Sequence, residues 1–181
     1  MKINKYIWIA FALSLTFMLS MCNRPAEESE NAAPSPFKFS AEDLYGNTVT
    51  EASLGDKELF FVHYWATWCG PCVSEMPDLA EVAKKYADKV GFIALLDDYG
   101  SAKSTAVEIA ENSGISFIMV DANHGDFTAL LSLVQSGYVP TTVLLDKDGN
   151  MVGEQIIGAY GAEYGRYIEE ALQRDQNGDD N

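Results

Sequence analysis

The chain has 181 residues, 48% of them hydrophobic, and carries 27 acidic and 12 basic side chains, which gives a formal net charge of −15 at pH 7. This charge repels phosphate groups, so it argues against nucleic acid as a partner and against adhesion to anionic lipid through basic clusters. The length suits one domain with a sizeable core, and we expect the charge to serve solubility.

The first 22 residues have the pattern of a targeting segment. Two lysines give a cationic start, and residues 6–21 carry no charge. The segment ends in a Leu-Ser-Met-Cys sequence that resembles a bacterial lipobox, in which Cys22 would be lipidated after cleavage. Because methionine stands where a small residue is usual, an uncleaved transmembrane anchor and a cleaved, fully secreted chain stay open. Each of the three would place the rest of the chain outside the cytoplasm.

Both ends of the chain differ in composition from its centre. Residues 23–36 predict a flexible tether, because prolines with small polar and acidic residues leave little apolar surface to bury. A compact domain is expected over residues 37–173. The acidic, polar residues 174–181 predict a disordered tail.

Extended segments open the domain. Residues 37–40 and 47–50, on either side of a turn at Gly46, predict two short strands ahead of the main one. Residues 59–64 are then apolar almost throughout, as expected of a strand that is buried on both faces. His63 interrupts this apolar run.

A Trp-Cys-Gly-Pro-Cys motif over residues 68–72 follows the strand, and a helical pattern of apolar residues follows the motif. A cysteine at a helix start faces unpaired backbone N–H groups and the positive end of the helix dipole, which favour its thiolate. Cys69 would then attack, and Cys72 would resolve the mixed disulfide. Two other interpretations are half of a zinc site, although the chain offers no second pair of ligands, and a permanently closed structural disulfide.

Residues 65–72, Trp-Ala-Thr-Trp-Cys-Gly-Pro-Cys, with Glu-Met-Pro at 75–77, resemble the thioredoxin superfamily. More narrowly, they are similar to the TlpA/ResA-like thiol–disulfide oxidoreductases of bacterial envelopes, and the resemblance covers residues 37–173. It implies an α/β, thioredoxin-like fold: a central mixed, mainly parallel β-sheet flanked by helices, with an N-terminal strand extension and one extra α/β insertion.

The remainder of the domain alternates helical and extended patterns, which favours a sheet covered on both sides. Asp97, Asp98 and the acidic residues of the turn at 146–150 are expected to be turn residues rather than metal ligands. Further strands are expected at 90–96, 116–120, 143–145 and 155–158, and helices at 102–112, 124–134 and 163–172.

His63 stands six residues before the first cysteine. At the matching place thioredoxins have a buried aspartate that helps to deprotonate the resolving cysteine, and envelope relatives often have an amide. A neutral imidazole here could accept the proton of Cys72. The other interpretation is a buried histidine that is satisfied by a backbone carbonyl and takes no part in the chemistry.

Pro140 enters the strand at 143–145, where a proline is costly unless the backbone geometry is special. The resemblance implies a cis proline that faces the two cysteines and leaves neighbouring backbone groups free to pair with an extended substrate. It also implies that the motif itself contacts the substrate, with an apolar platform supplied by its tryptophan. The residues expected to bind substrate are Trp68, Gly70, Pro71, Val139 and Thr141.

These features together predict a membrane-tethered thiol–disulfide oxidoreductase on the extracytoplasmic face of the bacterial cytoplasmic membrane, anchored as a lipoprotein. It would reduce disulfides in exported proteins, such as apocytochrome c or oxidised methionine sulfoxide reductase. The resemblance implies electrons from a membrane thiol carrier of the CcdA or DsbD type, and we expect no cofactor and no metal. The alternatives are an oxidant that forms disulfides and a non-enzymatic module that binds peptides.

Overall fold

The computed structural model describes residues 37–177. The predicted targeting segment, the lipidation site Cys22, the tether and residues 178–181 lie outside this part of the chain. Its strands are β1 (Ser40–Glu42), β2 (Thr48–Thr50), β3 (Leu59–Trp65), β4 (Val90–Leu96), β5 (Ile118–Asp121), β6 (Thr141–Asp146) and β7 (Ile156–Ile157). Its α-helices are α2 (Gly70–Lys85), α3 (Tyr99–Ser113), α4 (Thr128–Val134) and α5 (Tyr164–Asn177), with 3-10 turns at Glu51–Leu54, Gly125–Phe127 and Gly161–Glu163.

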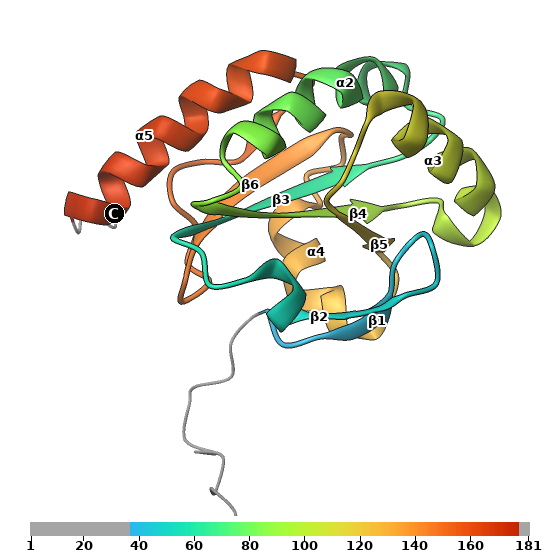
Figure 1. The fold of residues 1–181 in the computed structure, drawn as a ribbon, viewed down its shortest axis with the longest axis horizontal. Coiled ribbons are helices and arrows are strands. Elements are labelled where there is room, and N and C mark those ends of the chain that lie inside the picture. Colours follow the sequence, from blue (N-terminus) through green and yellow to red (C-terminus); the bar gives the residue numbers. More distant parts are fainter. Residues whose placement is uncertain (1–36, 178–181) are drawn as a thin grey trace, which may run out of the picture. The chain divides into compact units, whose positions relative to one another are not determined.

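The central sheet has five strands in the order β5-β4-β3-β6-β7 (Figure 1). Strand β4 pairs in parallel with β3 and β5, whereas β6 pairs antiparallel with β3 and β7. The predicted mixed sheet is therefore confirmed. Of its five strands, β3, β4, β5 and β7 run in the same direction and β6 runs opposite to them, so the sheet is mixed and mainly parallel as expected.

Every residue of β3 and β4 is buried, as their apolar sequences predict. Figure 1 shows α2, α3 and α5 over one face of the sheet and α4 on the other, on the side of the β1–β2 hairpin. Alternation along β3 sends Phe61 and Trp65 into the core under α2 and α5, and Phe60 and Val62 into the core on the α4 side. His63 shares the face of Phe61, so it points toward α2.

The N-terminal extension is an antiparallel hairpin of β1 and β2. Its first strand begins at Ser40, later than expected, because Phe37 and Phe39 are buried ahead of it against the core on the α4 side. The hairpin reaches β5 through a bridge between Asp43 and Val120. The predicted insertion is present as α3 and β5, and β5 forms one edge of the sheet.

The C-terminal helix is longer than the sequence pattern suggested. Ile168, Ala171 and Leu172 are buried at helical spacing, but α5 continues to Asn177. The predicted boundary at 173 thus falls inside α5, and the disordered tail stays a prediction. The polar composition there does not break a helix, since an exposed Arg174 in the last turn complements the helix dipole.

Candidate active site

Cys69 and Cys72 form a disulfide at the start of α2, with 5.2 Å between their Cα atoms. Cys69 is the N-cap residue, and its sulfur accepts a hydrogen bond of 3.2 Å from the backbone N–H of Cys72. Pro71 lies in the first turn, where a missing N–H costs nothing. The Cys69 side chain is 5% exposed and that of Cys72 fully buried, so a partner can reach only the first sulfur without rearrangement.

The Val139–Pro140 peptide bond is cis, as the resemblance implied. The carbonyl oxygen of Val139 lies 3.6 Å from the Cys69 sulfur, although the two residues are 70 positions apart in the sequence. The Pro140 carbonyl accepts a hydrogen bond from Gly158 N–H, which ties this loop to the end of β7. The fold therefore places a free backbone carbonyl beside the reactive sulfur.

Thr141, which is expected to bind substrate, has its side chain turned into the protein. Its side chain is fully buried, and its hydroxyl bonds to the Ser136 hydroxyl at 2.7 Å and to the Tyr138 carbonyl at 2.8 Å. Its backbone pairs with β3 and β7. These contacts hold the proline loop in place, and a contact of Thr141 with substrate stays a prediction.

Exposed aromatic side chains flank the disulfide and the proline loop. Trp68 is 67% exposed and Tyr138 is 69% exposed. Gly70 is exposed as well, and no atom lies within 4 Å of where a Cβ would stand. Solvent-facing rings next to Cys69 and Pro140 fit the expected apolar platform better than simple packing in the core.

The loop between β3 and the cysteine motif is held by the acidic pair at the end of β4. The Asp98 carboxylate accepts hydrogen bonds from the backbone N–H and the hydroxyl of Thr67, and Asp97 accepts one of 2.6 Å from the Tyr64 hydroxyl. These acids thus serve as structural acceptors in the turn. They keep the segment before Trp68 in place.

His63 is fully buried. Its Nδ1 atom lies 2.9 Å from the Thr142 hydroxyl oxygen, and its Nε2 atom lies 3.6 Å from Oε1 of Glu75. Its partners are therefore side chains, so the expectation of a backbone carbonyl partner is wrong. Burial lowers the pKa of His63 to about 3, which keeps the ring neutral at pH 7.

Glu75 is the residue that sequence reasoning missed. It is 4% exposed, and its Oε2 atom accepts hydrogen bonds from the backbone N–H groups of Tyr160 at 2.9 Å and Gly161 at 3.2 Å. It lies three residues after Cys72 in α2, so both side chains share one face of the helix. Burial raises the pKa of Glu75 to about 7, while the two backbone hydrogen bonds oppose the shift.

A signal for Glu75 was present in the sequence. Cys72, Met76 and Leu79 mark the buried stripe of α2, and a carboxylate three residues after Cys72 falls within that stripe. A charged side chain on an apolar face indicates either a buried partner or a shifted pKa. Here it has both. The site thus has a group that exchanges a proton near neutral pH, one helical turn from the second cysteine.

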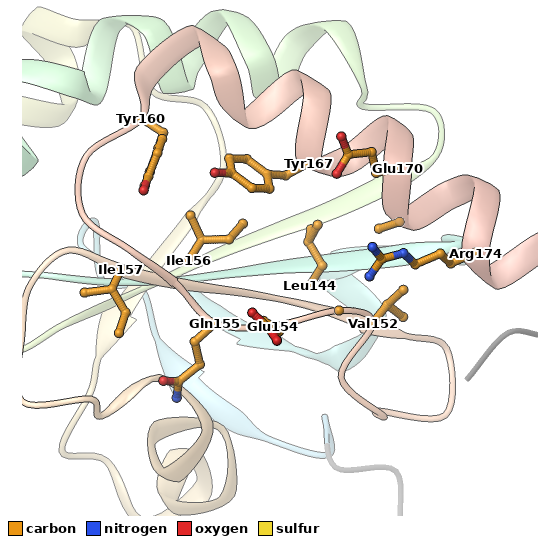
Figure 2. Close-up of a pocket in the computed structure, with 12 residues that line it drawn as sticks. Leu144, Val152, Glu154, Gln155, Ile156, Ile157, Tyr160, Tyr167, Glu170 and Arg174 are labelled. Atoms are coloured by element: carbon orange, nitrogen blue, oxygen red, sulfur yellow. The ribbon is translucent and has the colours of Figure 1, made fainter. Parts of the chain in front are cut away.

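A groove lies away from the cysteines, between the 152–157 segment and α5 (Figure 2). It has a volume of about 490 Å³ and an apolar floor that includes Leu144 and Ile156, with Tyr167 and Arg174 on the helix side. Tyr160, at one end, is the lining residue whose backbone also binds Glu75. No cysteine lines this groove, so we place the chemistry at the disulfide.

Within residues 37–177, no three histidine, cysteine or acidic side chains are grouped as a metal site would require. None of the helices in that part of the chain is both long and apolar enough to cross a bilayer.

A mixed sheet, a cysteine pair at the start of α2 and a cis proline beside it define a thioredoxin-like protein. The chain belongs to the Redoxin family, whose family model matches residues 28–162, and it is a TlpA/ResA-like member of the thioredoxin superfamily.

Curated relatives and a solved structure agree with this assignment. The thiol-disulfide oxidoreductase ResA of Bacillus thuringiensis is 34% identical over 122 residues, which cover 66% of this chain and 66% of that protein. ResA of Geobacillus kaustophilus is 36% identical over 120 residues, covering 66% and 64%. These matches thus span slightly less than two thirds of the relatives' length. The crystal structure of a thioredoxin-family thiol:disulfide interchange protein from Chlorobium tepidum is 28% identical, with a TM-score of 0.63, over 78% of this chain and 99% of that one.

Proposed function

We propose that this chain is a protein-disulfide reductase, a thiol–disulfide oxidoreductase that acts outside the cytoplasm on exported proteins. The observation that carries the proposal is the Cys69–Cys72 disulfide at the start of α2, with the carbonyl oxygen of Val139 3.6 Å from the Cys69 sulfur. The names of the two ResA relatives and of the Chlorobium tepidum structure support the same chemistry.

The reaction begins with both cysteines reduced. The Cys69 thiolate attacks a substrate disulfide, which forms a mixed disulfide and releases the other substrate sulfur as a thiolate that takes up a proton. Cys72 then loses its proton and attacks the Cys69 sulfur. The mixed disulfide breaks, and the second substrate thiolate leaves and is protonated. Two electrons have passed to the substrate, and the protein ends as the Cys69–Cys72 disulfide seen in the structure.

Cys69 is the better nucleophile of the pair. It is the N-cap of α2, so its thiolate would keep the hydrogen bond from Cys72 N–H and face the positive end of the helix dipole. Cys72 is fully buried and cannot meet a substrate first. These environments support attack by Cys69 and resolution by Cys72.

The resolving step needs a group that accepts the proton of Cys72. Glu75 is the nearest acid on the same face of α2, and burial raises its pKa to about 7. As a carboxylate it can take up a proton from a buried thiol that has no access to water. We therefore assign Glu75, rather than His63, as the direct proton acceptor, because the pKa of His63 is lowered to about 3.

Substrate would bind as an extended segment across the proline loop. The Val139 carbonyl is beside Cys69, and Trp68 and Tyr138 offer exposed rings on either side. Backbone pairing of this kind is tolerant of sequence, which suits a reductase with several protein substrates. Gly70 and Pro71 add no charge between the sulfurs.

The cellular setting is part of the proposal. The cationic start, the uncharged residues 6–21 and Cys22 support export and attachment as a lipoprotein, with residues 23–36 as a tether. A tethered reductase outside the cytoplasm has to be re-reduced there. We therefore propose a membrane thiol donor of the CcdA or DsbD type as its electron source.

An insulin-reduction assay with dithiothreitol tests the activity directly. The full-length chain should accelerate insulin precipitation well above dithiothreitol alone, and Cys69→Ser should abolish the acceleration. If the wild-type chain retains a peptide at the proline loop but does not accelerate the reaction, the non-enzymatic binding module replaces the reductase.

A further inference from the structure

Four buried polar side chains form a connected row that starts one helical turn after Cys72. Glu75 of α2 lies 3.6 Å from His63 of β3, whose Nδ1 atom lies 2.9 Å from the Thr142 hydroxyl of β6. Thr142 lies 3.4 Å from the Tyr164 hydroxyl of α5, which donates a hydrogen bond of 3.1 Å to the Gly158 carbonyl. Each of the four side chains is at most 4% exposed.

The direction of the hydrogen bonds in this row follows from the acceptors around Tyr164. The Gly158 carbonyl and the Glu75 carboxyl group can both accept from the Tyr164 hydroxyl, so its single proton is used on one of them. Tyr164 must then accept from Thr142, whose own proton is used in turn. The Thr142 oxygen is left as an acceptor for His63, which requires a proton on Nδ1. A neutral imidazole has one N–H, so its Nε2 atom carries a lone pair.

The Nε2 lone pair faces Oε1 of Glu75, which also lacks a hydrogen-bond partner. Nε2 of His63 and Oε1 of Glu75 make no hydrogen bond to any other described residue, although both are buried. The other carboxylate oxygen, Oε2, already accepts two backbone N–H groups. A proton on Oε1 would satisfy both atoms if their separation of 3.6 Å shortened to hydrogen-bond distance.

We propose that His63 is a positioning residue, fixed by Thr142 and Tyr164 as its neutral Nδ1-protonated tautomer, and that its Nε2 lone pair holds the proton of the Glu75 carboxyl group. This deepens the proposed function, on which its catalytic meaning rests, because the proton held there is the one that Cys72 supplies during resolution. His63 thereby sets the pH at which Glu75 can accept a proton.

The surroundings favour a neutral pair over an imidazolium and a carboxylate. The titratable groups that face Glu75 are Cys72 and Asp78 of α2, Tyr164 of α5 and His63 of β3. Asp78 adds a negative charge that raises the pKa of Glu75, and the Tyr164 hydroxyl and the two backbone N–H groups lower it. None of the five largest contributions to the pKa of Glu75 comes from a lysine or arginine. Two charges in a site without solvent would carry a large desolvation cost.

Nitrogen NMR of the imidazole rings of the full-length chain tests the tautomer. The chain has two histidines, and His124→Gln removes the exposed one, which leaves the signals of His63. We expect a protonated Nδ1 and an unprotonated Nε2, unchanged between pH 5 and pH 8. A protonated Nε2, or an imidazolium in this range, would overturn the proposal.

Thr142 provides the matched pair of variants. Thr142→Val removes the acceptor for Nδ1–H, so the ring should change to the Nε2–H tautomer, donate to the Glu75 carboxylate and lower the pKa of Glu75 by about one unit. Thr142→Ser keeps a hydroxyl and should leave both unchanged. The readouts are the ring tautomer and the carboxyl carbon titration of Glu75, and neither requires that the protein reduce disulfides. A Thr142→Val protein with the wild-type tautomer and titration would refute the proposal, whereas loss of insulin reduction alone would concern only the proposed function.

Discussion

The Nε2 atom of His63 lies 3.6 Å from the Oε1 atom of Glu75, and both side chains are buried where α2 packs on β3. Glu75 is also one helical turn from the resolving cysteine, Cys72. Burial moves the two pKa values in opposite directions, downward for the histidine and upward for the carboxyl group. In the proposed mechanism, the pair exchanges its proton through Glu75 at neutral pH, next to the thiol of Cys72.

Replacing the resolving cysteine should trap the reaction halfway. In Cys72→Ser the Cys69 thiolate can still attack a substrate disulfide, but no second thiol releases the product. We expect a covalent adduct with insulin whose disulfides are intact, or with another disulfide-bonded protein. Mass spectrometry should detect the adduct, and dithiothreitol should remove it. Cys69→Ser should give no adduct. Equal adduct from both single variants would mean that the assignment of attack and resolution is wrong.

Removing the proton acceptor should slow resolution without preventing attack. Glu75→Gln keeps the shape and can still accept from the Tyr160 and Gly161 N–H groups, but it cannot take up the proton of Cys72. General base catalysis contributes about 100-fold or more, so we expect stopped-flow resolution of a preformed mixed disulfide to fall by roughly 100-fold at pH 8. Glu81→Gln, on the exposed side of α2, is the control. An unchanged rate would remove Glu75 from the mechanism.

The raised pKa of Glu75 also makes stability depend on pH. Burial raises it from 4.5 to about 7, so between these values the folded protein holds a proton that the unfolded chain has released. Stability from this group is therefore present at low pH and is lost as the pH rises through about 7. We expect the unfolding free energy of wild type relative to Glu75→Gln to fall by about 3 kcal/mol between pH 4.5 and pH 8. Denaturant unfolding measures it, and a flat difference would contradict the buried carboxyl account.

Gly161 holds the loop that binds Glu75, and the structure leaves no room for a side chain there. Its φ is +50°, and an added Cβ would lie 2.7 Å from a carboxylate oxygen of Asp78. We expect Gly161→Ala to lower the unfolding free energy by about 1–3 kcal/mol. Gly125→Ala, where nothing lies within 4 Å, should change it by less than about 0.5 kcal/mol. Similar costs for both variants would argue against this close approach.

The redox motif was predictable because its chemistry is local. Strand, turn and helix follow one another within residues 59–85, and the apolar run, the proline and the cysteine spacing all favour the same geometry. The cis bond at Pro140 was implied only by resemblance, because its meeting with Cys69 joins residues 70 positions apart. The cis Val139–Pro140 bond in the structure therefore agrees with the family resemblance and was not indicated by a local sequence pattern.

The buried pair was not predictable in the same way. Its contacts depend on how α2 is rotated on β3 and on the register of β6, which places Thr142 opposite His63 from 79 residues away. The helical periodicity of α2 predicts that Glu75 lies on a buried face, but it does not predict that Glu75 lies beside His63. The end of α5 was hard to predict for a different reason: beyond the last buried residue, helical hydrogen bonding continues without an apolar signal.

The reduction potential of the Cys69–Cys72 pair tests the central claim most directly, because it separates a reductase from an oxidant without knowledge of the substrate. The full-length chain would be equilibrated with glutathione or dithiothreitol buffers and its oxidised fraction measured by thiol labelling. The account predicts a value near that of thioredoxin, about −270 mV, which marks a stable disulfide and a protein that donates electrons. A value near that of DsbA, about −120 mV, would contradict it and would identify a protein that forms disulfides.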